Sequence, residues 1–442
     1  MSLDTVEVLS KLVSIDTVNN RDAGKQAPIE CPEYINSILE EYGFETDILE
    51  SDGYYTALGT KGDGPCSVLF MAHFDVVPTG DEWKTDPFSL VVDGDRAYGR
   101  GTCDDKGNIV SLLHLAEKLS DWEIPCRVML AATGDEEIGG AHGARVLRDY
   151  LLDNDSFPTY IVIADGIHQQ VIYRRRNILP THIKVHAKES SAEGVAETVR
   201  FKTETFGTDT RHSAYMRPGV DRHAMLTASK YLDLHPQTVV KSVRGAFVKS
   251  NVVPDWVELD VLHTDTDGET YEYDEGLTGI MRSLLSVSQA SFPTEHSDKG
   301  TVICPNLLEK RDDVWDLYCD IRAMTNDGST VTSAIERAVG EYVRFDSVTA
   351  SSGIGFVQSD RESQLIHTAE IALEDVGIPF QLVEGFGGSD SRYFSGYGSD
   401  LFDFGPEGDN LHGPNEWVEL SSIEKNAEFF YRLVELLAGK QE

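Results

Sequence analysis

Side chains that can bind metal ions follow several short apolar runs of the sequence. The run SVLFMA leads into His73-Phe74-Asp75, and in an extended chain alternation places His73 and Asp75 on the same side. His73 could bind a metal through one ring nitrogen while Asp75 accepts the other ring N–H. A lone histidine is usually structural, but this spacing at the end of a predicted strand favours a metal ligand.

The run RVMLAAT leads into an acidic turn, GDEEIGG, which contains Asp135, Glu136 and Glu137. Adjacent carboxylates repel one another unless a cation compensates. The alternative is the start of a helix, where acidic residues are favoured. Two other apolar runs lead to single candidates: YIVIA ends at Asp165, and LFDFG precedes His412 in the segment LHGPNE.

A glycine-framed loop, YGRGTCDDKG over residues 98–107, lies between the first two strand ends and enters a helix. Glycines before a helix can cradle a phosphate, but the adjacent Asp104 and Asp105 would repel an anion. A carboxylate held rigidly in this loop could instead bridge two cations.

The charges of these groups suit two divalent cations. A hydroxide and three carboxylates, those of Asp104, Glu137 and Asp165, would balance two such ions. His73 and His412 would add neutral nitrogen ligands. Mixed nitrogen and oxygen ligands without thiolate favour zinc, with cobalt and manganese as alternatives. The remaining glutamate of the acidic turn is then left to act as a general base.

The elements that must position these side chains alternate along the first third of the chain. Helical patterns alternate there with short apolar runs, which predicts an α/β domain with a mostly parallel central sheet. Ligands of such sheets bind beyond the carboxyl ends of the strands, where the strand-end candidates fall.

The pattern changes after Arg176. Segments such as THIKVHAK and ETVRFKTET alternate polar with apolar residues, as strands with one exposed face do, and residues 333–343 look helical. Near Gln364 the first pattern returns, with two more helices, SQLIHTAEIALEDVG and residues 423–439. We therefore predict a catalytic domain formed by residues 1–176 and 352–442, interrupted by an inserted α+β lid domain of residues 177–351.

Composition bounds the class of protein. A chain of 442 residues exceeds the usual limit of about 250 to 300 residues for one core, so two domains are expected. There are 38 Lys and Arg against 75 Asp and Glu, a net charge of −37 that argues against nucleic-acid binding. Because the acids are spread along the whole chain, we hypothesise a halophilic source; an acidic mesophilic protein is the alternative.

The N-terminal residues lack a charged start followed by an apolar run, and no stretch reaches about 18 apolar residues. We therefore expect neither a signal peptide nor a membrane span. The six cysteines lack CxxC spacing and are expected to be reduced, buried thiols of a cytoplasmic protein.

The motifs HFDVVP, YGRGTCDDKG, TGDEEIGG and HGPNE occur in an order and spacing that resemble one family over nearly the whole chain. This is the co-catalytic metallopeptidase family that includes carboxypeptidase G, peptidase T, dipeptidases, aminoacylase, acetylornithine deacetylase and succinyl-diaminopimelate desuccinylase. The resemblance implies a metal-binding α/β domain interrupted by a smaller lid domain, through which the family commonly forms homodimers.

The resemblance also implies roles for individual residues. One metal takes His73 and Asp165, the other takes Glu137 and His412, and Asp104 bridges both. Asp75 supports the first histidine. Glu136 matches the catalytic base, which deprotonates a metal-bridging water and hands the proton to the leaving amine.

In the lid, the segment GTDTRHS over residues 207–213 resembles a family segment whose histidine reaches the active site of the partner subunit and polarises the scissile carbonyl there. The resemblance therefore makes His212 the candidate oxyanion stabiliser. The family holds the substrate carboxylate with an asparagine and an arginine. Arg322 is the candidate arginine, because guanidinium binds carboxylate bidentately. The asparagine is either Asn251, in an NVVP segment, or Asn306.

The segment GGSDSR over residues 387–392 resembles the family's glycine-rich substrate loop, which would bring Gly388 and Arg392 to the ligand; a plain turn is the alternative.

The function expected is hydrolysis of an amide bond in a small peptide or dipeptide, because family members with Asp at the position of Asp165 tend to be aminopeptidases and dipeptidases. Deacylation of an N-acyl amino acid is the alternative. A two-metal phosphoesterase is disfavoured, because it would need cationic groups around the phosphate and this chain is strongly acidic. A non-catalytic binding protein is also disfavoured, because it would be expected to have lost a ligand or the base, and all of these residues are present.

Overall fold

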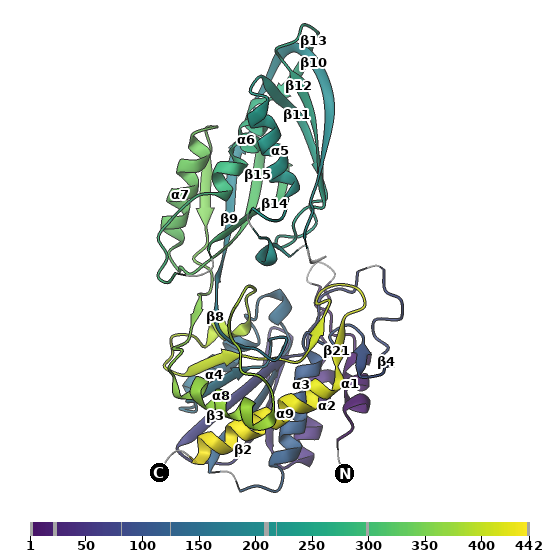
Figure 1. Cartoon of the computed structure of the whole chain (residues 1–442), viewed down its shortest axis with the longest axis vertical. Helices are drawn as coiled ribbons and strands as arrows, with labels where there is room; N and C mark the ends of the chain where they lie inside the picture. The colour runs from purple at the N-terminus through teal and green to yellow at the C-terminus, as the bar shows by residue number, and fades with distance from the viewer. Residues whose placement is uncertain are drawn as a thin grey trace. The chain divides into compact units, whose positions relative to one another are not determined.

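The computed structural model describes residues 3–20, 24–80, 82–123, 125–206, 212–217, 219–297 and 300–439. The chain forms two compact units, one of Met1–Arg175 with Val357–Glu442 and one of Arg176–Phe356 (Figure 1). Each unit has its own hydrophobic core. None of the described helices combines the length and apolar composition that a bilayer crossing requires.

The first unit is built on one mixed sheet. Eight of its strands follow the order β1 (Glu45–Ser51), β2 (Tyr54–Lys61), β6 (Cys126–Thr133), β3 (Cys66–His73), β7 (Tyr160–Ile163), β19 (Asp400–Asp403), β8 (Val171–Arg175) and β17 (Val357–Gln358). A further strand, β18 (Leu382–Gly385), pairs with β8. The central strands β6, β3, β7 and β19 are parallel to one another, whereas β1, β2 and β17 pair antiparallel at the margins. This arrangement confirms the predicted α/β class.

Residues of the central strands alternate between two cores. Val68, Phe70 and Ala72 of β3 face one core, and Leu69 and Met71 face the other. Because parallel strands buried on both faces need apolar residues at every position, they appear in the sequence as continuous apolar runs. Because β3 pairs parallel with both β6 and β7, the carboxyl ends of these three strands meet at one edge of the sheet, as the sequence predicts.

Helices cover both faces of this sheet. The larger core includes residues of α1 (Thr5–Ser14), α2 (Glu30–Glu41), α3 (Lys106–Leu119), α8 (Gln364–Val376) and α9 (Leu420–Gly439). The smaller core includes residues of α4 (Ala144–Asp153). In Figure 1 the yellow helix α9 runs across this unit, and it packs against α3 and α8.

A small antiparallel sheet joins two distant segments of the first unit. Its order is β20 (Gly408–Asp409), β21 (Trp417–Glu419), β5 (Arg96–Tyr98) and β4 (Val91–Asp93). Trp417 pairs with Tyr98, so the segment that contains His412 is fixed beside the glycine-framed loop that begins at residue 98.

The second unit is an α+β structure with two four-stranded sheets. One has the order β11 (Thr238–Gly245), β12 (Trp256–His263), β10 (Glu189–Lys202) and β13 (Glu269–Asp274). The other has the order β14 (Val302–Arg311), β15 (Val314–Ala323), β9 (Asn177–His186) and β16 (Ser347–Ala350). Helices α5 (Ala224–Leu234), α6 (Glu275–Ser288) and α7 (Gly328–Gly340) pack against these sheets.

Candidate metal centre

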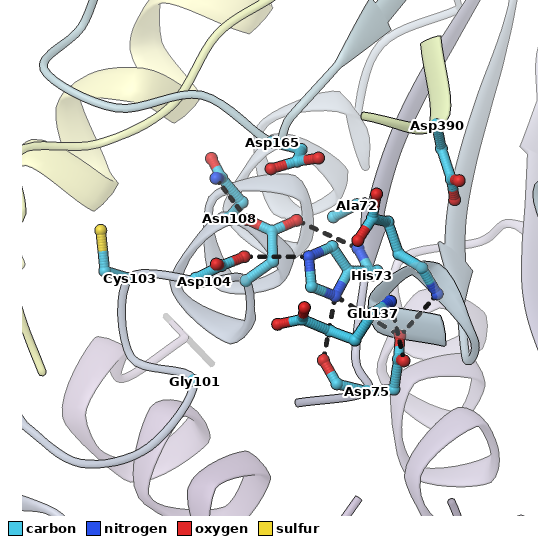
Figure 2. A network of polar contacts seen from close by, with 12 residues as sticks. Ala72, His73, Asp75, Gly101, Cys103, Asp104, Asn108, Glu137, Asp165 and Asp390 are labelled. Atoms are coloured by element: carbon cyan, nitrogen blue, oxygen red, sulfur yellow. Dashed lines mark hydrogen bonds and ion pairs between the residues drawn. The ribbon is translucent and has the colours of Figure 1, made fainter. Parts of the chain in front are cut away.

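Five side chains predicted to bind metal lie together at the carboxyl edge of the central sheet. Two groups have ligand atoms within 4.8 Å of one another: one is His73, Asp104 and Asp165, and the other is Asp104, Glu137 and His412. Asp104 belongs to both groups. Figure 2 shows Asp104, His73, Glu137 and Asp165 converging from separate strand ends and loops.

His73 is the last residue of β3 and is almost fully buried. Its Nε2 lies 3.0 Å from Oδ1 of Asp104, and its Nδ1 lies 2.9 Å from the main-chain oxygen of Asp75 (Figure 2). The Asp75 carboxylate is 3.5 Å from the same Nδ1. Asp75 therefore contacts the ring nitrogen that faces away from Asp104, chiefly through its main chain rather than its side chain.

The second oxygen of Asp104 contacts the other histidine. Oδ2 of Asp104 lies 3.1 Å from Nε2 of His412, which is also 3.1 Å from Oε1 of Glu137. A carboxylate whose two oxygens face two different imidazoles has the geometry needed to bridge two cations. Asp104 sits in a turn where Gly101 has a φ of +81° and where a Cβ at Gly107 would lie 2.3 Å from the Thr102 carbonyl oxygen. Only glycine fits these two positions without strain.

Charge interactions in the centre are strong because His73 and Asp104 are buried, whereas His412 is exposed. Burial alone would lower the pKa of His73, but hydrogen bonds to Asp104 and Asp75 outweigh it and raise that pKa well above its usual value. Burial alone would raise the pKa of Asp104, but His412 and His73 hold it below its usual value. Burial, followed by the nearby Glu136 charge, raises the pKa of Asp165 well above that of an exposed aspartate.

These residues fit a pair of divalent cations. Asp165 is a half-buried carboxylate whose charged form is disfavoured by its surroundings, so a cation beside it would supply the missing compensation. The donor set combines imidazole nitrogens and carboxylate oxygens without a thiolate, which suits zinc, cobalt or manganese. His73 and Asp165 would hold one ion, Glu137 and His412 the other.

Glu136 opens the short 3-10 helix η1 (Glu136–Ile138) and belongs to neither ligand group. Its main-chain N–H donates to Oδ1 of Asp75 at 3.0 Å, and the N–H of Glu137 donates to Oδ2 at 3.1 Å. Burial raises the pKa of Glu136 to about 7. Cations bound alongside would lower that pKa, because positive charge favours the carboxylate form.

The predicted substrate loop also reaches Glu136. Arg392 lies in the short helix η3 (Asp390–Tyr393), and its Nη2 is 3.9 Å from Oε1 of Glu136. The carbonyl oxygens of Gly387 and Gly388 accept from Nη1 of Arg175 at 3.3 and 3.5 Å. Arg175 also donates from Nη2 to the main-chain oxygen of Asp165 at 2.7 Å, so one guanidinium ties this loop to a candidate metal ligand.

Of the predicted lid residues, two contact each other in the second unit. Nδ1 of His212 accepts a hydrogen bond from the Ala214 main-chain N–H at 3.1 Å, and its Nε2 lies 3.3 Å from Nδ2 of Asn251. Residues 207–211 of the predicted segment lie outside the described residues.

The other two lid candidates are buried and make contacts of their own. Arg322 donates from Nε and Nη2 to the carboxylate of Asp320 at 2.8 and 3.0 Å, which is a bidentate pair within β15. Nδ2 of Asn306 donates to the main-chain oxygen of Ser250 at 2.6 Å, and the Asn306 side chain lies beside His223. Their proposed contacts with a substrate carboxylate stay predictions.

Three charged residues that adjoin the centre, Asp105, Arg100 and Glu416, have no role predicted from the sequence. Asp105 accepts the His73 main-chain N–H at 3.0 Å, while the buried Arg100 and Glu416 form an ion pair at 2.7 Å. The signal that could have revealed the ion pair is the presence of opposite charges in two motifs, YGRGTCDDKG and HGPNE, that both carry candidate metal ligands.

Comparison with known proteins agrees with this geometry. A family model described as peptidase family M20/M25/M40 matches residues 69–436. A succinyl-diaminopimelate desuccinylase of Sulfurovum sp. (strain NBC37-1) is 23% identical over 434 residues, covering 97% of this chain and 97% of that protein.

Solved structures share the fold over almost the whole chain. The aminoacylhistidine dipeptidase of Vibrio alginolyticus has a TM-score of 0.69 at 16% identity and covers 98% of this chain and 96% of that chain. The M20 family metallo-carboxypeptidase Sso-CP2 of Sulfolobus solfataricus has a TM-score of 0.63 at 16% identity and covers 99% of both chains. The resemblance predicted from the motifs is confirmed: the chain is a metal-dependent hydrolase and belongs to peptidase family M20/M25/M40.

Proposed function

We propose that this enzyme hydrolyses the amide bond of a small peptide, with Glu136 as the general base. The observation that carries the proposal is that Glu136 alone among the acids of its turn combines two features. It stays outside both ligand groups, and its main chain is fixed by Asp75 beside them. A base held next to the cations, without being a ligand, is free to move a proton.

Different residues of the chain bind the cations and transfer the proton. His73, Asp165, Glu137, His412 and the bridging Asp104 would hold two divalent cations, for which we favour zinc. When bound, such ions polarise the scissile carbonyl and lower the pKa of a water. Glu136 accepts the proton that this water loses as its oxygen attacks the carbonyl carbon, and it then donates the proton to the leaving amine nitrogen.

The proposed oxyanion stabiliser, His212, is supported by its tautomer. Because its Nδ1 accepts the Ala214 N–H, that nitrogen carries no proton, and the neutral ring carries its proton on Nε2. An Nε2–H group is the donor that a developing oxyanion requires. A half-turn of the Asn251 amide brings its oxygen to face this N–H when substrate is absent.

The substrate class rests on Asp165. In the family that this chain resembles, aspartate at this position is typical of aminopeptidases and dipeptidases, so we propose a substrate with a free amino group. Deacylation of an N-acyl amino acid is the second candidate, because the desuccinylase of Sulfurovum is similar over 97% of the chain. We also propose that the enzyme works in the cytoplasm as a homodimer formed through the second unit.

A substrate panel separates the two candidates. Metal-loaded protein is assayed with free dipeptides and with N-acetyl and N-succinyl amino acids, beside Glu136→Gln and a surface control, Glu374→Gln, from the exposed side of α8. We expect the wild type and the control to cleave free dipeptides and Glu136→Gln to be inactive. Cleavage confined to the acylated compounds would instead make the enzyme a deacylase.

A further inference from the structure

Glu416 is a fully buried carboxylate whose two oxygens accept four hydrogen bonds from one loop. Oε2 accepts from Nη1 of Arg100 at 2.7 Å and from the Gly101 N–H at 3.0 Å. Oε1 accepts from the N–H groups of Cys103 and Asp104 at 2.9 and 3.0 Å. Three main-chain N–H groups and one guanidinium thus converge on a single anion, as in an anion-binding nest.

The loop that Glu416 holds is the one that presents Asp104. Since the Asp104 N–H is itself a donor to Glu416, the main chain at that residue is fixed, and its side chain then reaches His73 on one oxygen and His412 on the other. Without Glu416, buried N–H groups of this turn would lack an acceptor, which costs free energy unless the loop moves.

Glu416 also belongs to the second ligand segment. It follows His412 by four residues, its main-chain oxygen accepts the Gly99 N–H at 3.1 Å, and the next residue, Trp417, pairs with Tyr98. The residue therefore joins, by side chain and main chain, the loop of Asp104 to the segment of His412. These two side chains are candidate ligands of the same cation.

We propose that Glu416 is a positioning residue of the metal centre: its carboxylate fixes Asp104 relative to His412 and so sets the affinity of the cation that both would bind. The inference rests on the proposed two-metal function. It predicts that loss of the Glu416 charge weakens metal binding, although Glu416 is not itself a ligand. Partners of metal ligands typically change affinity by about 10- to 100-fold when they are replaced.

Glu416→Gln tests this with the least change of shape. The amide replaces one acceptor oxygen with a donor NH2, which must face either Arg100 and Gly101 or the N–H groups of Cys103 and Asp104. The matched control is Glu384→Gln, which removes a carboxylate of the same unit that pairs with Arg174 at 3.0 Å. If Glu416→Gln does not fold, Arg100→Lys keeps the positive charge but loses the planar fork, and it takes the same measurements.

Zinc affinities are measured by competition with a chelator on the full chain, and cobalt-loaded protein is compared by its visible absorption. We expect wild type and Glu384→Gln to bind two ions with the same affinities. Glu416→Gln should bind one ion at least about tenfold more weakly, show an altered cobalt spectrum, and regain its kcat in excess metal.

Affinities for both ions within twofold of wild type in Glu416→Gln, with an unchanged cobalt spectrum, would overturn the positioning role. That result leaves the proposed function intact, since wild type would still bind two ions. A wild type that fails to bind two ions would contradict the proposed function itself, and the positioning role with it.

Discussion

The carboxylate of Asp75 accepts the main-chain N–H of Glu136 at 3.0 Å. The other oxygen of Asp75 accepts the N–H of Glu137 at 3.1 Å and Nδ2 of Asn19 at 3.0 Å. The same residue accepts from Nδ1 of His73 through its main-chain oxygen, at 2.9 Å, when that nitrogen is protonated. Asp75 therefore links a candidate metal ligand to the candidate base, and it does so from a fully buried position.

Replacing Asp75 with Asn should lower kcat by about 10- to 100-fold with a small change in KM. An asparagine amide keeps one acceptor oxygen but replaces the other with an NH2 donor. That donor must face either the N–H of Glu136 or the N–H of Glu137 and the Asn19 amide, so the turn that carries the base must shift. Steady-state kinetics of Asp75→Asn beside an exposed control, Asp52→Asn, measures this. A kcat equal to that of wild type would mean that Asp75 does not position Glu136.

His212→Gln should lower kcat by about 10²- to 10³-fold while KM changes little, because an oxyanion donor acts mainly in the transition state. The adjacent Tyr215, whose ring centroid is 5.7 Å from that of His212, gives a control variant, Tyr215→Phe, that keeps the ring contact. A rise in KM at unchanged kcat would assign His212 to substrate binding instead.

Stability of the second unit should depend on pH through His223. Burial lowers the pKa of His223 to about 4 from an ordinary value of 6.5, and the neutral ring caps α5 by accepting the Met225 N–H. The unfolded chain therefore binds a proton that the folded chain does not. The contribution of the neutral His223 to the free energy of unfolding is fully present above pH 6.5 and decreases as the pH falls. Below pH 4 the folded protein has lost about 3 kcal/mol of stability through this group.

His223→Asn removes this titration and keeps the cap, since an asparagine oxygen can accept the same N–H. Urea midpoints measured between pH 7 and pH 4 should therefore fall less for His223→Asn than for wild type. Equal pH dependence of the two proteins would show that His223 is not held neutral.

Salt should stabilise the protein because its net charge is −37. The Debye length shortens from about 10 Å at 0.1 M salt to about 3 Å at 1 M, so repulsion between surface carboxylates weakens. We expect the thermal midpoint to rise over this range, as the halophilic hypothesis requires. An unchanged midpoint and full activity without added salt would favour an acidic mesophilic protein.

Much of the first unit could be predicted because its signals are local. Strands β3, β6 and β7 are mostly apolar runs. β3 ends at the candidate ligand His73, and the candidate ligands Glu137 and Asp165 follow shortly after the ends of β6 and β7. Helix α7 begins earlier than the predicted residue 333, at Gly328, because the side chain of Asp327 accepts the N–H groups of Ser329 and Thr330.

Other features of the fold have weaker signals in the sequence. Helix α6 was not predicted although Leu277, Ile280 and Leu284 follow a helical spacing, since two glycines and three serines dilute that pattern. The ion pair of Arg100 with Glu416 joins residues 316 positions apart, and a contact of that range leaves no periodic signal. The hydrogen bonds by which Glu416 holds the loop of Asp104 were therefore not predicted from the sequence.

The most direct test of the account compares kcat with metal content in Glu136→Gln. We expect this variant to bind two divalent ions as wild type does, while kcat falls by at least about 10²-fold, because Glu136 moves the proton without being a ligand. Activity near that of wild type at full metal content would contradict the assignment of Glu136 as the base. Loss of one bound ion would instead make Glu136 a ligand.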